Sequence, residues 1–243
     1  MRPLLLAALW SVSDGYAVNV AGAQMRVSPV ASVNVNMLAA STDSAAVAKA
    51  SSSLLAEISK DSRSLTSIEN MVTTIESTGR NTKIKKAVLG EWKIVFATDE
   101  EAVKPFAAGG GDGPFAVLED VFLRLLSGYE LQTIEVVRKI GPFGNMAQSL
   151  YGKFDLTTGD DSDSLSWKPT YMVNERGREV DAPNGAAKRM EWVVSHVSKE
   201  LLVLRRATNA KSYVVCTRLG KGKLNDELEE ACVDAEQILG LVG

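Results

Sequence analysis

Metal-binding residues are scarce in this chain. Its 243 residues include two cysteines, Cys216 and Cys232, and one histidine, His196. Structural zinc sites use four closely spaced cysteine or histidine ligands, so this scarcity argues against a metal centre. We expect both cysteines to be buried thiols, because free cysteine often packs as a small apolar side chain. A disulfide between them is the open alternative.

A surplus of positive charge is also missing. The 27 lysines and arginines face 30 aspartates and glutamates, which gives a net charge of −3. Because nucleic-acid binding relies on cations that neutralise phosphates, we expect no nucleic-acid partner. No apolar run reaches the roughly 18 residues that a membrane-spanning helix needs. With 45% hydrophobic and 23% charged residues, the composition is typical of a globular protein of one or two domains.

The common motifs of catalysis and phosphate binding are absent as well. The glycine run at 109–113 lacks the G-K-[ST] of a P-loop, as does Gly220-Lys221-Gly222-Lys223. No G-x-S-x-G elbow accompanies His196, which we expect to be a hydrogen-bonded structural residue. The acidic turn at 160–163 is typical of a solvated loop. We therefore expect no catalytic residues, and an enzyme would need a polar pair that the sequence does not offer convincingly.

The start of the chain has the composition of a targeting segment. Arg2 precedes an apolar stretch at 3–10, and Ala21-Gly22-Ala23 matches an A-x-A cleavage site. The stretch 24–53 is rich in serine and alanine and holds one acidic residue, Asp43, as in transit peptides. This succession resembles the bipartite leader of algae with secondary plastids.

The composition divides the chain into a leader segment and one folded domain. We predict a removable or disordered leader at 1–53, with the mature N-terminus between Gln24 and Ser53, and a folded domain at 54–243. The predicted location is a plastid. The alternative is a secreted protein in which a linker follows the signal peptide. The scarcity of cysteine argues mildly against this alternative, because secreted proteins often contain disulfides.

Helical spacing at the two ends of the folded domain flanks a region of strands. Apolar residues from Leu54 to Ile75 predict one long or two short amphipathic helices that end near Gly79. A second helical pattern covers 115–125, and a third, with an acidic outer face, covers 224–239. Strands separated by turn residues are predicted at 91–98, 130–140, 147–157, 164–173, 189–197, 201–206 and 211–218. Strands without crossover helices indicate an antiparallel barrel or sandwich.

The segment 89–98, L-G-E-W-K-I-V-F-A-T, is the most specific part of the chain. Alternation along a strand places Trp92, Ile94 and Phe96 on one face. A G-x-W that opens a first strand resembles the calycin-type barrels, which include the lipocalins. There the glycine permits a tight turn and the tryptophan plugs one end of the barrel.

Further motifs extend the resemblance to the plastid lipid-associated proteins, also called the PAP/fibrillin family. The family's first strand, G-x-W-x-L-x-Y-T, is matched by 90–98, its Q-T-I run by 131–135 and a later aromatic strand by 150–154. Its Y-L-D-E-D-L-R-I-x-R pattern is matched by 197–206, followed by a strand at 212–215. Lys199 and Leu201 replace the two aspartates of that pattern, which puts any role of those aspartates in doubt here.

The resemblance implies a mainly β protein, namely a lipocalin-like antiparallel β-barrel with N-terminal amphipathic helices and a C-terminal helix. A barrel of about eight strands can enclose one small ligand. The resemblance implies binding or coating of lipids, prenylquinones or carotenoids at thylakoid or plastoglobule surfaces, with no other cofactor. The alternative is a structural subunit with a filled barrel that docks on a thylakoid complex or a biosynthetic enzyme.

Site residues follow from the predicted barrel. We expect its lining to include Trp92, Ile94, Phe96, Phe154, Leu156, Trp167, Leu202 and Leu204. In calycin-type barrels an arginine from a late strand stacks on the G-x-W tryptophan. Leu202 and Leu204 share a strand face with Arg206, so we predict that Gly90, Trp92 and Arg206 close one end of the barrel.

Overall fold

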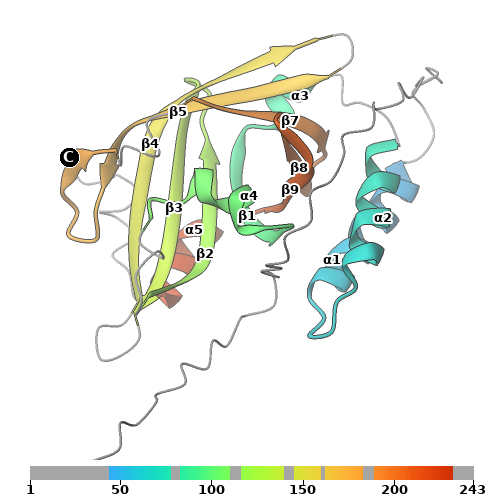
Figure 1. Cartoon of the computed structure of the whole chain (residues 1–243), viewed down its shortest axis with the longest axis horizontal. Coiled ribbons are helices and arrows are strands. Elements are labelled where there is room, and N and C mark those ends of the chain that lie inside the picture. Colours follow the sequence, from blue (N-terminus) through green and yellow to red (C-terminus); the bar gives the residue numbers. More distant parts are fainter. Residues whose placement is uncertain are drawn as a thin grey trace, which may run out of the picture.

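Eight antiparallel strands form a closed β-barrel with helices packed outside it (Figure 1). The computed structural model describes residues 44–77, 83–109, 116–139, 145–159, 162–182 and 189–231. The predicted fold class is therefore confirmed. The strands lie in the order β4-β3-β2-β1-β9-β8-β7-β5, and pairing of β4 with β5 closes the barrel.

Seven of the nine strands follow the predicted segments closely, and β2 and β6 are additional. They are β1 (Gly90–Ala97), β2 (Ala116–Leu125), β3 (Glu130–Lys139), β4 (Asn145–Thr158), β5 (Asp163–Val173), β6 (Glu179–Asp181), β7 (Met190–Val197), β8 (Leu201–Arg206) and β9 (Asn209–Arg218). The short β6 pairs only with the end of β5 and lies outside the barrel. The longest strand pairing joins β4 and β5. It runs from Ser149, which pairs with Val173, to Thr158, which pairs with Asp163.

Segment 116–125 is strand β2, so the helix predicted there is wrong. Val121, Leu123 and Leu125 face the barrel interior, whereas Phe122 belongs to the cluster on the outer face. A bulge between Leu118 and Asp120 also breaks the alternation. Because both faces of this strand are covered, apolar residues occur on both, and their spacing imitates that of a helix.

A helical hairpin covers one outer face of the barrel. Helices α1 (Ser44–Ile58) and α2 (Leu65–Ser77) pack Leu54, Ile68 and Val72 onto residues of β1, β8 and β9. In Figure 1 this pair lies beside the barrel at the right. Of the two predicted alternatives, two short helices are therefore correct. Helix α1 begins at Ser44, however, inside the segment predicted to be the leader. Cleavage after Ser53 would cut α1, whereas cleavage before residue 44 would keep the hairpin whole.

Helix α5 (Lys223–Glu230) covers β2, β3 and β4, while the single-turn α3 (Ile84–Ala87) lies just before β1. On α5, Leu224 and Leu228 pack against Phe122, Ile134 and Val136. The Lys93 ammonium lies 2.7 Å from Glu227 Oε2 and 3.1 Å from Asp120 Oδ1, which links α5 to the barrel wall. Burial lowers the pKa of Lys93, but the bonds to both carboxylates outweigh it and raise the pKa overall. The predicted continuation of this helix to residue 239 lies outside the described residues beyond 231.

Candidate functional site

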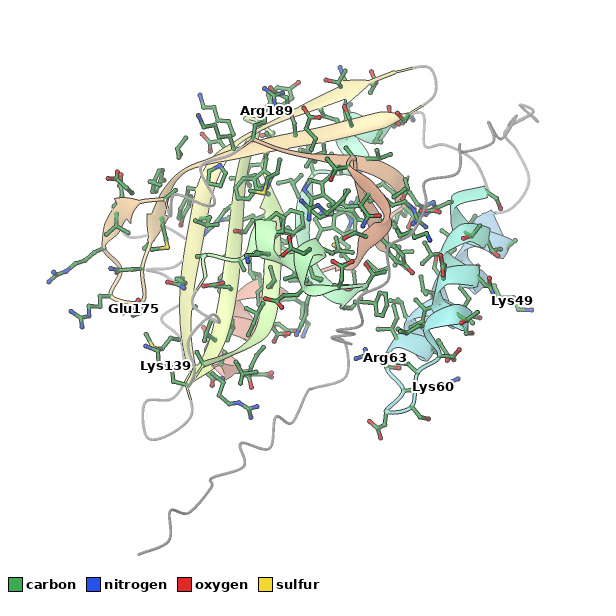
Figure 2. All side chains as sticks on the ribbon, in the orientation of Figure 1. Lys49, Lys60, Arg63, Lys139, Glu175 and Arg189 are labelled. Carbon is green, nitrogen blue, oxygen red and sulfur yellow. The ribbon has the colours of Figure 1, made fainter. Side chains whose placement is uncertain are left out.

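The barrel interior is an apolar cluster built from every strand of the barrel. Trp92 comes from β1, Phe154 from β4, Trp167 from β5 and Trp192 from β7, and each is 2% exposed or less. Figure 2 shows side chains crowding the space that the strands enclose. An aromatic interior of this kind is compatible with binding of an apolar ligand, which barrels of this size can enclose.

Seven of the eight predicted lining residues pack in or against this interior cluster. They are Trp92, Ile94, Phe154, Leu156, Trp167, Leu202 and Leu204. Phe96 is the exception, and its assignment is corrected. A bulge between Ile94 and Phe96 interrupts the alternation of β1. The Phe96 ring therefore faces outward under α1 and α2, with its centroid 6.0 Å from that of Tyr213.

Gly90, Trp92 and an arginine close one end of the barrel, but the arginine is Arg218. The Arg218 guanidinium carbon lies 3.9 Å from the centroid of the Trp92 ring, close enough for a cation–π contact. The indole N–H of Trp92 donates to the Val88 carbonyl at 2.9 Å. Gly90 has φ 134°, and a β-carbon there would lie 2.2 Å from Arg218 Nη1. Position 90 therefore requires glycine for two reasons. Its φ is positive, and the Arg218 guanidinium occupies the space that a β-carbon would need.

Arg218 holds three parts of the chain together at this end. Its Nη1 and Nη2 donate to the carbonyls of Leu89 and Ala87, which precede β1, and its Nε donates to the Lys199 carbonyl between β7 and β8. These carbonyls satisfy a planar, five-donor side chain as a single lysine ammonium would not. Burial lowers the pKa of Arg218, although its ordinary pKa is high enough for it to remain charged.

The prediction of Arg206 is wrong because β8 runs antiparallel to β9. Leu201 pairs with Thr217 next to Arg218, so the other end of β8, with Arg206, lies at the opposite end of the barrel. There Arg206 Nη1 donates to the Glu101 carbonyl at 3.1 Å. Its neighbour Arg205 faces outward, with Nε 2.6 Å from Glu76 Oε1 on α2 and the guanidinium carbon 4.5 Å from the Tyr213 ring centroid.

A short helical segment covers the end of the barrel opposite Trp92. Helix α4 (Glu100–Val103) is continued by the 3₁₀ helix η1 (Lys104–Phe106). Asp99 caps α4, because its Oδ1 accepts the Ala102 N–H at 2.7 Å. In Figure 1, α4 lies across the space that the strands enclose.

Phe106 is the largest side chain that this cover adds to the interior cluster, beside Ala102, Val103 and Ala108. Its ring centroid lies 4.8 Å from that of Trp192 and 6.4 Å from that of Trp167, with interplanar angles of 29° and 9°. At the far side of the cover, the Ala108 N–H donates to Glu135 Oε2 at 2.8 Å. Asp99 and Glu135 therefore fix the cover at its two ends.

Four polar groups are buried among the strands of the barrel. The Glu135 carboxylate is 1% exposed and is also bonded by Gln148. The Thr133 hydroxyl and the indole N–H groups of Trp167 and Trp192 have no hydrogen-bond partner among the described residues. A buried donor without a partner costs about 1–3 kcal/mol, so such groups in a folded interior call for an explanation.

His196 lies outside the interior, beneath α2. Its side chain is buried, and Nε2 has no hydrogen-bond partner among the described residues, so the expectation of a hydrogen-bonded histidine is not met. Burial lowers the pKa of His196, and the nearby Glu76 carboxylate opposes this effect in part.

The remaining sequence expectations concern metals and thiols. Within the described residues there is no group of His, Cys, Asp or Glu suited to a metal ion. Among those residues, too, no helix is both long and apolar enough to cross a membrane. Cys216 is a free thiol in the interior cluster, where burial raises its pKa, and Cys232 lies outside the described residues.

Three site residues were missed at the sequence level: Arg218, Phe106 and Trp192. A usable signal existed for two of them. Asp99, followed by two glutamates and then Pro105, is the pattern of a capped helix start, and it would have placed Phe106 in a covering element. Alternation of Trp192 with Val194 marks the inner face of β7. Arg218 carries no such signal, because its partner is fixed only by strand order.

Comparison with models of known protein families and with curated proteins gives no match to this chain.

Proposed function

We propose that this chain is a binding protein that holds or coats hydrophobic molecules in a plastid. The observation that supports it best is a closed barrel whose interior is apolar and aromatic, with one end sealed by Arg218 and the other covered by α4 and η1. The resemblance to the PAP/fibrillin family supplies the ligand class, namely lipids, prenylquinones or carotenoids. It also supplies the location, peripheral to thylakoid membranes or plastoglobules. We propose no catalytic role.

Extraction of the purified protein tests this function directly. Protein isolated from its native source is extracted with organic solvent, and the extract is examined by mass spectrometry. A lipid, prenylquinone or carotenoid at a fixed ratio to protein supports the proposal. A matched control is the same protein unfolded and washed before extraction, which removes a specifically held ligand. An extract that matches this control contradicts ligand carriage.

The location is tested through the leader. We propose that a leader within residues 1–53 directs the chain into a plastid of secondary origin and is then removed. A fusion of residues 1–53 to a fluorescent protein should enter the plastid, and N-terminal sequencing of the mature protein should give a start after residue 23. Secretion of the fusion, or a mature protein that keeps Met1, would contradict this location.

A second function, docking without a ligand, is favoured by one specific observation. The large aromatic side chains of the interior cluster are only 0–1% exposed, as in a filled core. They are Trp92, Phe106, Trp167 and Trp192. In that case the protein would be a structural subunit on a thylakoid complex or a biosynthetic enzyme. A ligand-free extract, together with comigration of the native protein with such a complex, would favour docking over binding.

A further inference from the structure

Two tryptophans under the cover end of the barrel share an unusual chemistry. Trp167 on β5 and Trp192 on β7 belong to directly paired strands, where Trp167 faces Met190 and Trp192 faces Leu165. They are therefore diagonal neighbours on the inner face, within reach of one side chain or ligand. Both are 1% exposed, and both indole N–H groups lack a partner among the described residues.

Trp92 shows what a satisfied indole looks like in the same interior. Its N–H donates to the Val88 carbonyl at 2.9 Å, and its ring is covered by Arg218. Buried tryptophan usually finds such a partner. The two donors near the cover thus differ from the one at the sealed end, although all three rings belong to the same cluster.

The side chain that lies against both rings belongs to the cover and not to the barrel wall. Phe106 stacks on Trp192 at 4.8 Å and on Trp167 at 6.4 Å between centroids, yet it belongs to η1 and not to a strand. Its segment is held by the Asp99 cap, by the bond from Arg206 to the Glu101 carbonyl and by one bond from the Ala108 N–H to Glu135. Phe106 lies outside the strands, so another ring can take its position without a change in strand pairing.

We propose that Trp167 and Trp192 form the polar end of a ligand site beneath Phe106. The site takes a flat, apolar molecule that carries one or two acceptor oxygens, such as ketone or quinone carbonyls. The two indole N–H groups donate to these oxygens, and the ligand ring replaces that of Phe106 in the aromatic stack. This assignment rests on the proposed binding function and narrows the ligand class within it, because a pure hydrocarbon would leave both donors unpaired.

The test uses two probes that share one skeleton. Duroquinone is a methylated benzoquinone with two carbonyl oxygens, and durene is the methylated benzene of the same substitution pattern without them. Affinities of the full chain for both are measured by NMR titration of the indole N–H signals, of which the four tryptophans supply four. The signals of Trp167 and Trp192 should move on titration, while that of Trp92 should not.

Three variants locate the site and separate its parts. Trp167→Phe and Trp192→Phe each keep an aromatic ring but remove a donor, so each should weaken duroquinone binding by about 2- to 12-fold and leave durene binding unchanged. Phe106→Ala removes the competing ring and should strengthen the binding of both probes. Phe122→Leu, on the outer face under α5, is the matched control and should change neither affinity.

The outcomes distinguish this inference from the function on which it rests. If both probes bind but the tryptophan variants weaken them equally, the donor role is wrong and the apolar binding function stands. If neither probe binds to the native chain or to Phe106→Ala, the site beneath Phe106 is overturned, and ligand recovery by extraction then decides the function separately. If a tryptophan variant fails to fold, an unchanged affinity of Phe106→Ala for both probes also overturns the site.

Discussion

At the scale of single residues, this protein depends on a few positions where no other side chain fits. The clearest is Gly90, which combines a positive φ with a guanidinium where a β-carbon would lie. The local motif G-x-W is thus explained by what surrounds it. Trp92 fills the sealed end, Arg218 covers the indole, and glycine makes room for both.

Replacing Gly90 with alanine should destabilise the fold strongly. The substituted β-carbon would lie 2.2 Å from Arg218 Nη1, and φ would remain 134°. We expect a loss of about 2–4 kcal/mol in the free energy of unfolding, measured by urea denaturation. Gly128→Ala is the control, because its β-carbon would approach nothing closer than 3.9 Å. Equal stability of the two variants would contradict this account of the motif.

His196 should make stability depend on pH. Burial lowers its pKa in the folded state, so the unfolded chain binds a proton first as pH falls. The free energy of unfolding should therefore decrease as pH falls below about 6.5, the ordinary pKa of histidine, and continue to decrease down to the lowered pKa of the folded state.

The measurement compares the native chain with His196→Gln at about pH 7.5 and about pH 5.5. The difference in stability between the two chains should shift in favour of the variant at the lower pH. The chain has one histidine, so no other imidazole contributes. A difference independent of pH would show that His196 titrates alike in the folded and unfolded chains.

At the scale of elements, the helices are attached by specific contacts in addition to apolar surface. On α2, the Glu76 carboxylate accepts hydrogen bonds from Arg205 Nε at 2.6 Å and from Arg205 Nη2 at 2.9 Å. The same guanidinium lies over the Tyr213 ring. On α5, Glu227 receives the Lys93 ammonium. Each helix thus has a charged contact with a strand next to its buried apolar face.

The Arg205–Glu76 pair should show a measurable coupling energy. Both side chains are less than one fifth exposed, at 17% and 19%, and the contact is bidentate. A double-mutant cycle with Arg205→Met and Glu76→Gln should give about 1–2 kcal/mol. The same cycle on Arg189 and Asp155, an ion pair with side chains 55% and 69% exposed, should give about 0–0.5 kcal/mol. Equal couplings would mean that the bidentate geometry adds nothing.

Helix α5 should stabilise the barrel, not anchor the protein to a membrane. Leu228 is fully buried against β2, β3 and β4, so Leu228→Ala should cost about 2–5 kcal/mol in the free energy of unfolding. Leu65→Ala, at a site 51% exposed on α2, is the matched control and should change stability by less than about 1 kcal/mol. Unchanged stability of Leu228→Ala, with lost binding to anionic vesicles, would reverse the assignment.

At the scale of the whole molecule, the decisive contact is the pairing of β4 with β5. It converts a row of strands into a barrel without open edges at these positions, and it brings Phe154 opposite Trp167 inside. A register shift between Tyr151 and Gly152 leaves Thr170 of β5 without a partner in this pairing. The shape of the interior therefore depends on closure more than on any single lining residue.

Gly152→Ala should disturb that closure. The added β-carbon would lie 2.2 Å from the Lys168 carbonyl oxygen, which is backbone and cannot swing aside as a side chain can. We expect a loss of about 2–4 kcal/mol with a broad effect on amide exchange across β4 and β5. Gly220→Ala meets only a lysine side chain at 3.6 Å and serves as the control. Changes in amide exchange that are confined to one turn would contradict a role of Gly152 in barrel closure.

The sequence by itself determined the strand content, most strand bounds and the inner face of most of the barrel. Alternation is a local property, so Phe154, Leu156, Trp167, Leu202 and Leu204 could be placed without knowing their partners. It failed where local rules are interrupted or overridden. A bulge turned Phe96 outward, and burial of both faces made β2 imitate a helix.

Tertiary structure alone decided which residues from distant segments meet. Arg206 and Arg218 both end a late strand, and only the antiparallel pairing of β8 with β9 places Arg218 on Trp92 and Arg206 at the other end. In the same way, Phe106 meets Trp167 and Trp192 because a short segment after β1 folds back over the closed barrel. Local sequence fixes which face a side chain takes, but strand order and direction fix its neighbours, and those depend on the free energy of the whole chain.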